Sequence, residues 1–278
     1  MSFPARLHVL LARGAPTAVV IRRGPSDRVC TIGWDRKTDT FDLGQWLHGR
    51  IYERRSDLSP DGKHLIYFAM NARWDSDTGG SWTAISRAPW LTAVTLLGKG
   101  DCWHGGGLFT GNRHYWLNDG AGHRVMRDST RIRRNREYAP ERGFGGECPG
   151  VYYPRLIRDG WILQEHNQIG RMESLTVFEK PLRHGWLLRK LAHEQVDAPE
   201  GKGCYWDEHV LLHAQRGVTI AQPDWEWAEL DGNRLVFASK GCLYAVAPPG
   251  TDADVLAEPT LLRDFNAMAF EARQAPYH

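Results

Sequence analysis

Short apolar runs that each follow a turn signal recur along this chain, and they constrain its fold more than any other feature. The turn signals lie at residues 59–63, 110–112, 159–160, 207–208 and 231–233. The first three intervals are each about 49 residues, and the last is about half as long. Repeats of roughly 40 to 50 residues with several strands each are typical of propeller blades. The spacing predicts an all-β chain, folded as a single β-propeller domain over residues 1–278.

The run at residues 65–68, Leu-Ile-Tyr-Phe, is apolar without interruption. An antiparallel strand with one wet face should alternate between apolar and polar residues. An unbroken run therefore predicts a strand covered on both faces, as happens when each sheet lies between two others. Further strands are expected at 82–86, 92–97, 175–179, 186–191, 242–247 and 260–263. About 24 candidate strands in all correspond to five or six blades.

The segment LSPDGKHLIY at residues 58–67 resembles the WD40-like repeat of TolB-type propellers. The motif covers about a dozen residues once, with partial echoes at the other turn signals. The resemblance implies the propeller fold and no catalytic residue. A complete Gly-His to Trp-Asp signature of true WD40 repeats is not present in the sequence.

The two ends of the chain suggest how such a ring would close. The first blade has readable strands at 7–11, 18–22 and 29–34, and no innermost strand can be read before them. Residues 268–273, Met-Ala-Phe-Glu-Ala-Arg, alternate as a strand should and follow the last blade. We predict that this C-terminal strand inserts beside residues 7–11 and so closes the ring, since an open sheet edge is a liability.

Long connections are expected on one face of the propeller, at 35–49, 71–81, 99–106, 136–150, 167–173 and 193–203. Long loops on a rigid scaffold often carry function. The side chains expected on this face are Trp74, Asp75, Asp77, Trp103, His104, Glu147, His166, Asn167, Arg171 and Glu173. The segment 101–107 is also rich in glycine, which suits either a ligand or a crowded strand start.

Aromatic, acidic and imidazole side chains on one face favour a non-enzymatic scaffold that binds a protein or peptide partner. A small polar ligand or a glycan is a further possibility for the same face. The alternative function is a carbohydrate-active hydrolase, which needs two carboxylates converging on an open pocket. A third interpretation is that the loops only cap a central channel.

The densest basic run contains Arg124 and Arg127 and continues with four further arginines. Those four could bind an anion, or they could protect a solvated strand edge. They are Arg131, Arg133, Arg134 and Arg136. Since no aromatic residue is interleaved before Tyr138, single-stranded nucleic acid is an unfavoured partner.

The remaining composition excludes several classes of protein. The net charge of +2 gives no global field toward nucleic acid or membrane. Five widely spaced cysteines without a CxxC pair argue against a zinc site and a disulfide framework. No nucleotide-binding motif is present, so we expect neither a metal nor a cofactor. Without an apolar leader or a spanning segment, a cytoplasmic location is expected.

Overall fold

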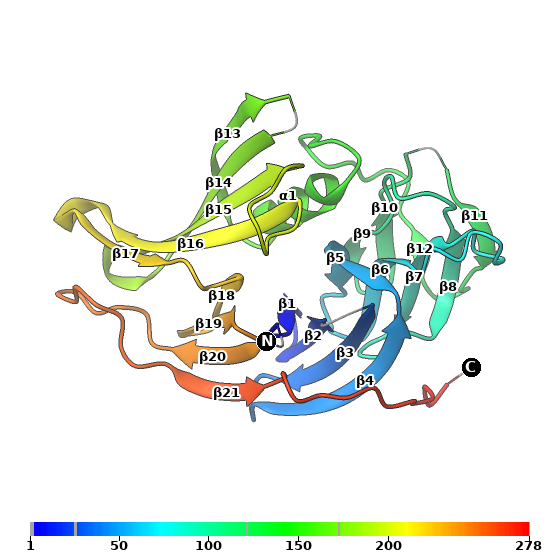
Figure 1. The fold of residues 1–278 in the computed structure, drawn as a ribbon, viewed down its shortest axis with the longest axis horizontal. Coiled ribbons are helices and arrows are strands. Elements are labelled where there is room, and N and C mark those ends of the chain that lie inside the picture. The colour runs from blue at the N-terminus through cyan, green and yellow to red at the C-terminus, as the bar shows by residue number, and fades with distance from the viewer. Residues whose placement is uncertain (1–2, 25–26, 121, 172, 278) are drawn as a thin grey trace. The chain divides into compact units, whose positions relative to one another are not determined.

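The computed structural model describes residues 3–24, 27–120, 122–171 and 173–277, which form an all-β chain with one α-helix (Figure 1). The strands form five separate sheets, and their pairing is antiparallel apart from a two-residue parallel bridge between β10 and β12. The chain divides into two compact units. Unit 1 is built from His8–Arg155 and the residues from Met268 onward, and unit 2 from Pro4–Leu7 and Leu156–Ala267.

Unit 1 contains three sheets. The first is β1 (Arg6–Leu11, whose first two residues belong to unit 2), β2 (Thr17–Arg23), β3 (Arg28–Asp35) and β4 (Thr40–His48). The second, in spatial order, is β11 (Arg124–Arg127), β8 (Ala93–Gly98), β7 (Ser81–Arg87), β6 (His64–Met70) and β5 (Arg50–Leu58). The third is β12 (Arg133–Arg134), β10 (His114–Leu117) and β9 (Gly107–Gly111). Helix α1 (Cys148–Arg158) begins in unit 1.

Unit 2 contains the other two sheets and two short 3-10 helices, η1 (Arg183–Gly185) and η2 (Ala214–Arg216). One sheet is β13 (Ile162–Gly170), β14 (Glu173–Pro181), β15 (Leu187–Gln195), β16 (Tyr205–His213) and β17 (Val218–Gln222). The other is β18 (Trp227–Asp231), β19 (Arg234–Ser239), β20 (Cys242–Val246) and β21 (Thr260–Asp264).

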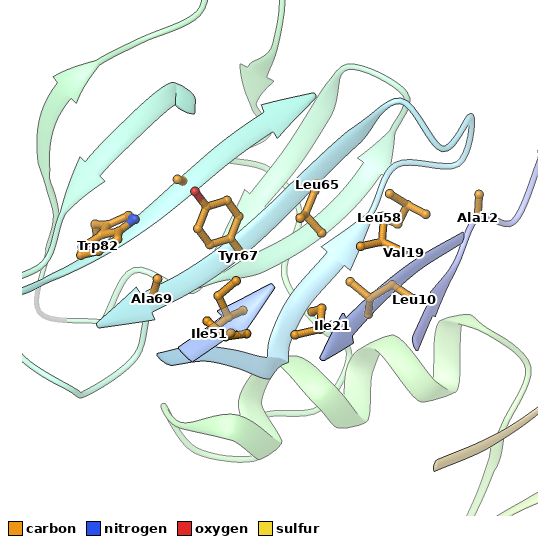
Figure 2. Packing of buried hydrophobic residues seen from close by; sticks show 12 residues of the cluster. Leu10, Ala12, Val19, Ile21, Ile51, Leu58, Leu65, Tyr67, Ala69 and Trp82 are labelled. Carbon is orange, nitrogen blue, oxygen red and sulfur yellow. The ribbon is translucent and has the colours of Figure 1, made fainter. Parts of the chain in front are cut away.

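Strand β6 is buried on both of its faces, which explains its unbroken apolar run. Leu65 and Tyr67 belong to a core cluster that also holds Leu10 and Ile21 from the first sheet, as Figure 2 shows. Ile66 points to a second cluster, which includes Phe109 of β9. Because successive side chains of a strand alternate between faces, the sheet of β6 lies between two other sheets of unit 1.

The β5–β6 hairpin is closed by the turn that the sequence signalled most clearly. The Ser59 hydroxyl accepts the backbone N–H groups of Lys63 and His64 at 3.1 and 2.9 Å and donates to Asp61 Oδ1 at 2.7 Å. Gly62 has φ +70°, a conformation that favours glycine. The turns at 110–112 and 231–233 also join paired strands, β9 to β10 and β18 to β19.

The two other turn signals were misread. Residues 207–208 lie inside β16 instead of preceding a strand. Residues 159–160 follow α1, so β13 is preceded by a helix where an innermost strand was expected. Pro154 lies inside this helix, where proline is unusual. The buried residues Val151, Tyr152 and Tyr153 of the helix are of types that also favour strands. For these reasons the local sequence did not predict a helix here.

Several of the predicted loops contain regular structure, and the one expected at 136–150 runs into the start of α1. The loop expected at 35–49 is largely strand β4, so the first sheet has four strands and lacks none. Likewise β13 extends to Gly170 and β15 to Gln195, which shortens the connections expected at 167–173 and 193–203.

The prediction that residues 268–273 insert beside residues 7–11 is wrong. These residues form no strand, and they lie along β4, at the opposite edge of the first sheet from β1. Gln45 Nε2 donates to the Arg273 carbonyl at 3.0 Å, and the Phe270 ring lies 5.0 Å from the His48 ring. With β4 in place, the first sheet needs no extra strand.

The N-terminal segment also makes contacts with distant parts of the sequence. Within unit 2, the backbone N–H of Ala5 donates to Asn266 Oδ1 at 2.9 Å, and that of Leu7 donates to Glu226 Oε1 at 3.2 Å. The first two residues of β1, Arg6 and Leu7, therefore belong to unit 2, and the rest of the strand belongs to the first sheet of unit 1.

Candidate binding face

The predicted site residues are divided between the two units. Trp74, Asp75, Asp77, Trp103, His104 and Glu147 belong to unit 1, whereas His166, Asn167, Arg171 and Glu173 belong to unit 2. The unit 1 residues lie on loops that meet at one end of its sheets. A Cβ placed on Gly79 would lie 3.1 Å from Cα of Gly100, which shows how closely the loops 71–80 and 99–106 approach. We call this part of unit 1 the long-loop end.

A buried arginine that the sequence did not single out organises the long-loop end. The side chain of Arg55, on β5, is 1 % exposed. Its guanidinium donates to the carbonyl of Cys102 at 2.8 Å, to the carbonyl of His104, and to Glu147 Oε2 at 3.2 Å. It also lies 5.1 Å from the centre of the Phe68 ring. One buried cation thus fixes two loops that are far apart in the sequence.

His104 is half-buried, and its ring is packed against backbone. It has φ +57°, and a Cβ placed on either Gly120 or Gly146 would collide with its imidazole ring. Asn118 Nδ2 donates to the carbonyls of Gly105 and Gly146 at 3.3 and 2.8 Å, which holds the same two segments together. The glycines near His104 therefore make room for its ring.

Trp103 stands on this fixed loop with 58 % of its surface exposed. Asp101 Oδ1 accepts its backbone N–H at 2.8 Å, and Asp101 Oδ2 accepts Lys99 Nζ at 2.7 Å. Burial opposes ionisation of Asp101, but the hydrogen bonds from Lys99 and from the Trp103 N–H lower its pKa. The Asp101 carbonyl also accepts the Ser81 hydroxyl at 2.6 Å. A large apolar side chain is thus exposed on a backbone that is anchored on both sides.

Trp74 is the second exposed tryptophan of the long-loop end, at 56 %. A Cβ placed on Gly80 would lie 2.7 Å from a carbon of its ring, so the ring rests against the base of its own loop. Asp75 and Asp77 are exposed on the same loop.

A partly buried chain of hydrogen-bonded side chains lies next to these loops and was also missed from sequence. Arg134 Nη1 donates to Asp119 Oδ2 at 2.7 Å, Asp119 Oδ1 lies 2.6 Å from His123 Nδ1, and His123 Nε2 lies 3.1 Å from Thr83 Oγ1. Burial lowers the pKa of His123, although Asp119 opposes that shift. Thr83 is fully buried and also accepts the N–H of Gly106 at 2.8 Å, so its hydroxyl holds the backbone before β9 and has no access to a substrate.

The arginine run occupies two sheet edges. Arg124 and Arg127 lie on edge strand β11, and Arg133 and Arg134 lie on edge strand β12. Arg131 and Arg136 are exposed beside β12. Charged edge strands discourage pairing with another chain, and the positions of Arg124, Arg127, Arg133 and Arg134 suit that role.

In unit 2, the predicted residues lie on the β13–β14 hairpin. His166 and Asn167 are within β13, not in a loop, and His166 Nδ1 is 2.8 Å from Thr176 Oγ1. Glu173 begins β14, and Arg171 is exposed at the hairpin tip. Within the described parts of the chain, no group of three His, Cys, Asp or Glu side chains is placed to hold a metal ion.

Comparisons with known proteins give little further guidance. No family model and no curated protein matches the sequence. The apo structure of AtxE2 isopeptidase is similar at 11 % identity and a TM-score of 0.37, covering 96 % of this chain and 53 % of that one. The chain therefore spans about half the length of that protein, and similarity at this level carries no argument about activity. No helix among the described residues is long and apolar enough to cross a membrane.

Proposed function

We propose that this chain is a β-propeller binding module whose long-loop end engages a protein or peptide partner. The five sheets are the proposed blades of a single domain. The double burial of β6 supports this architecture, because stacked blades would produce it.

The observation that carries the binding proposal is the exposure of Trp103 on a rigid backbone. Tryptophan is enriched among residues that dominate binding energy at protein interfaces. A preorganised anchor also loses little conformational freedom when a partner binds. Here Arg55, Asp101 and Ser81 have already ordered the loop. Trp74, on the neighbouring loop, would supply a second anchor.

The hydrolase alternative receives less support from the same end of unit 1. A glycosidase needs one carboxylic acid with a raised pKa opposite a second carboxylate. Glu147 is paired with Arg55, and Asp101 is paired with Lys99. Burial opposes ionisation of Asp119, but hydrogen bonds from His123 and Arg134 lower its pKa. Basic partners therefore favour the anionic forms of Asp101 and Asp119, and the ion pair of Glu147 with Arg55 suits a structural role.

The test begins with a photoreactive amino acid at position 75, which is exposed next to Trp74 and leaves both tryptophan anchors in place, and which identifies the partner by cross-linking in cells. The affinity of the purified partner is then measured for the unmodified chain, for Trp103→Ala and for Trp74→Ala. We expect Trp103→Ala to weaken binding by at least about tenfold without changing the melting temperature. Val255→Ala is the matched control, because Val255 is 74 % exposed and outside the long-loop end. Equal affinity of all four proteins would refute the proposal.

The proposed cellular location is the cytoplasm. All five cysteines are free thiols, two of them exposed, and exposed thiols suit a reducing compartment. Determining the oxidation state of Cys102 and Cys204 in cells tests this directly, since a disulfide or mixed disulfide at either position would argue against it.

A further inference from the structure

A cleft of about 610 Å³ lies in unit 1 where three turns meet. The β2–β3 turn supplies Arg23 and Asp27, the β4–β5 turn supplies His48 to Arg50, and the segment after β6 supplies Met70 to Arg73. The N–H of Gly49 donates to the Asp27 carbonyl at 2.6 Å. We call this cavity the three-arginine cleft.

Glycine is required at position 49 for this arrangement. Gly49 has φ +137°, and a Cβ there would collide with the carbonyl of Met70. The backbone of the β4–β5 turn therefore approaches the backbone after β6 more closely than any other residue would allow. This close approach brings Arg50 and Arg73 to the same cavity.

Two of the three guanidinium groups form no ion pair with a carboxylate of the described residues. Arg23 Nη1 is 3.8 Å from Glu53 Oε1. Arg50 lies over the Tyr52 ring at 4.6 Å. Across residues 3–24, 27–120, 122–171 and 173–277, no carboxylate lies within ion-pair distance of Arg50 or Arg73.

The carboxylate that pairs with Arg23, Glu53, favours its anionic form. Burial would raise the pKa of Glu53, but the charges of Arg23, Arg50 and His8 lower it to about 2. Its charge offsets part of that of Arg23 and Arg50. Among the described residues that line the cleft, Asp27 is the one acidic side chain. The positive groups still outnumber the negative ones, so the cavity favours an anionic ligand.

We propose that the three-arginine cleft binds a small organic phosphate. Planar guanidinium groups pair with phosphate oxygens through two parallel hydrogen bonds, which distinguishes arginine from lysine in such sites. The cavity volume is within the range of about 300 to 1,000 Å³ that small-molecule sites occupy. This ligand site is separate from the tryptophan anchors and does not depend on the proposed partner.

Calorimetric titration of the full chain with inorganic pyrophosphate tests the proposal. We expect saturable binding to one site that weakens as the salt concentration rises. Arg73→Met should weaken binding by at least about tenfold, since it removes a charged hydrogen-bond donor. Arg73 is exposed on a loop, so the variant should keep the melting temperature of the unmodified chain. Arg113→Met is the control, because Arg113 is an exposed arginine outside the cleft.

Three outcomes would overturn the proposal. They are no binding at millimolar pyrophosphate, equal binding by Arg73→Met, or equal affinity for citrate, which would indicate general attraction of anions. Trp103→Ala should bind pyrophosphate as the unmodified chain does. A failure here therefore leaves the partner-binding proposal untouched, and a failure of that proposal leaves the cleft untouched.

Discussion

Arg55 Nη2 lies 3.2 Å from Glu147 Oε2, and this contact joins β5 to the segment before α1 across 92 residues of sequence. The guanidinium is buried and also holds two carbonyl groups of the Trp103 loop. A buried cation with these partners makes the long-loop end rigid, and its removal has a measurable cost.

Replacing Arg55 with Met should destabilise the protein by about 3 kcal/mol, because Glu147 and two carbonyl groups lose a charged donor. Urea unfolding measures the difference. Arg113→Met, at an exposed position, should change the free energy of unfolding by less than about 0.5 kcal/mol. If the two variants were equally stable, Arg55 would not be the organising residue that its contacts indicate.

The C-terminal segment should stabilise unit 1 through Tyr277. Its hydroxyl accepts the backbone N–H of Arg87 at 3.0 Å and donates to the Thr92 carbonyl at 2.8 Å. Tyr277→Phe should therefore cost about 1 to 2 kcal/mol in the free energy of unfolding, since it leaves a partly buried N–H without its acceptor. Tyr52→Phe is a suitable control, because the Tyr52 ring contacts would be kept. Equal stability of the two variants would contradict the anchoring role.

Glu53 should make the protein sensitive to acid. Burial raises its pKa, but Arg23, Arg50 and His8 outweigh burial and lower it to about 2 in the folded protein, below the ordinary value of 4.5. Between these pH values the unfolded chain binds the extra proton, so the stabilisation is complete above pH 4.5 and is lost as pH falls toward 2. The loss is on the order of 2 kcal/mol.

The measurement is urea unfolding at several pH values from 5 to 2.5, which compares the unmodified chain with Glu53→Gln. The variant should lose less stability over this range. Glu137→Gln, which removes an exposed carboxylate, should follow the unmodified chain. Parallel curves for all three proteins would show that Glu53 does not titrate as we expect.

The cysteines should differ sharply in reactivity. Burial raises the pKa of Cys30 to about 12, with Arg22 opposing that shift, so this thiol stays protonated and covered at neutral pH. Cys102 and Cys204 are exposed. Iodoacetamide treatment of the folded protein, followed by peptide mass mapping, should modify Cys102 and Cys204 and leave Cys30 intact. In urea all five should react, and labelling of Cys30 in the folded state would be inconsistent with its burial.

The sequence predicted those parts of the fold that depend on local signals. The turn at Ser59 and the doubly buried run that starts at Leu65 could both be read from neighbouring residues. Strand β4 could not, because Gly44 and the polar residues around it are typical of a loop. The structure gives the reason for this glycine, since a Cβ at Gly44 would collide with the Pro89 carbonyl.

In the candidate site too, features marked by neighbouring residues could be predicted, and features that depend on distant residues could not. Trp103 and Trp74 could be predicted as loop residues because they lie in long stretches between predicted strands, and the structure shows both of them exposed. Arg55 was missed because its partners are 47, 49 and 92 residues away, and nothing nearby marks it as more than another strand residue. The three-arginine cleft was missed for the same reason, since its arginines come from three separate turns.

The bonds of the N-terminal segment have a consequence for how the chain is made. Ala5 and Leu7 are synthesised early, yet their partners Asn266 and Glu226 follow 261 and 219 residues later. At roughly 5 to 20 residues per second, a ribosome needs on the order of 10 to 50 seconds to span that distance. The start of β1 must therefore wait for its partners until Glu226 and Asn266 have been synthesised, so unit 2 can complete these contacts only after the chain between them has been translated.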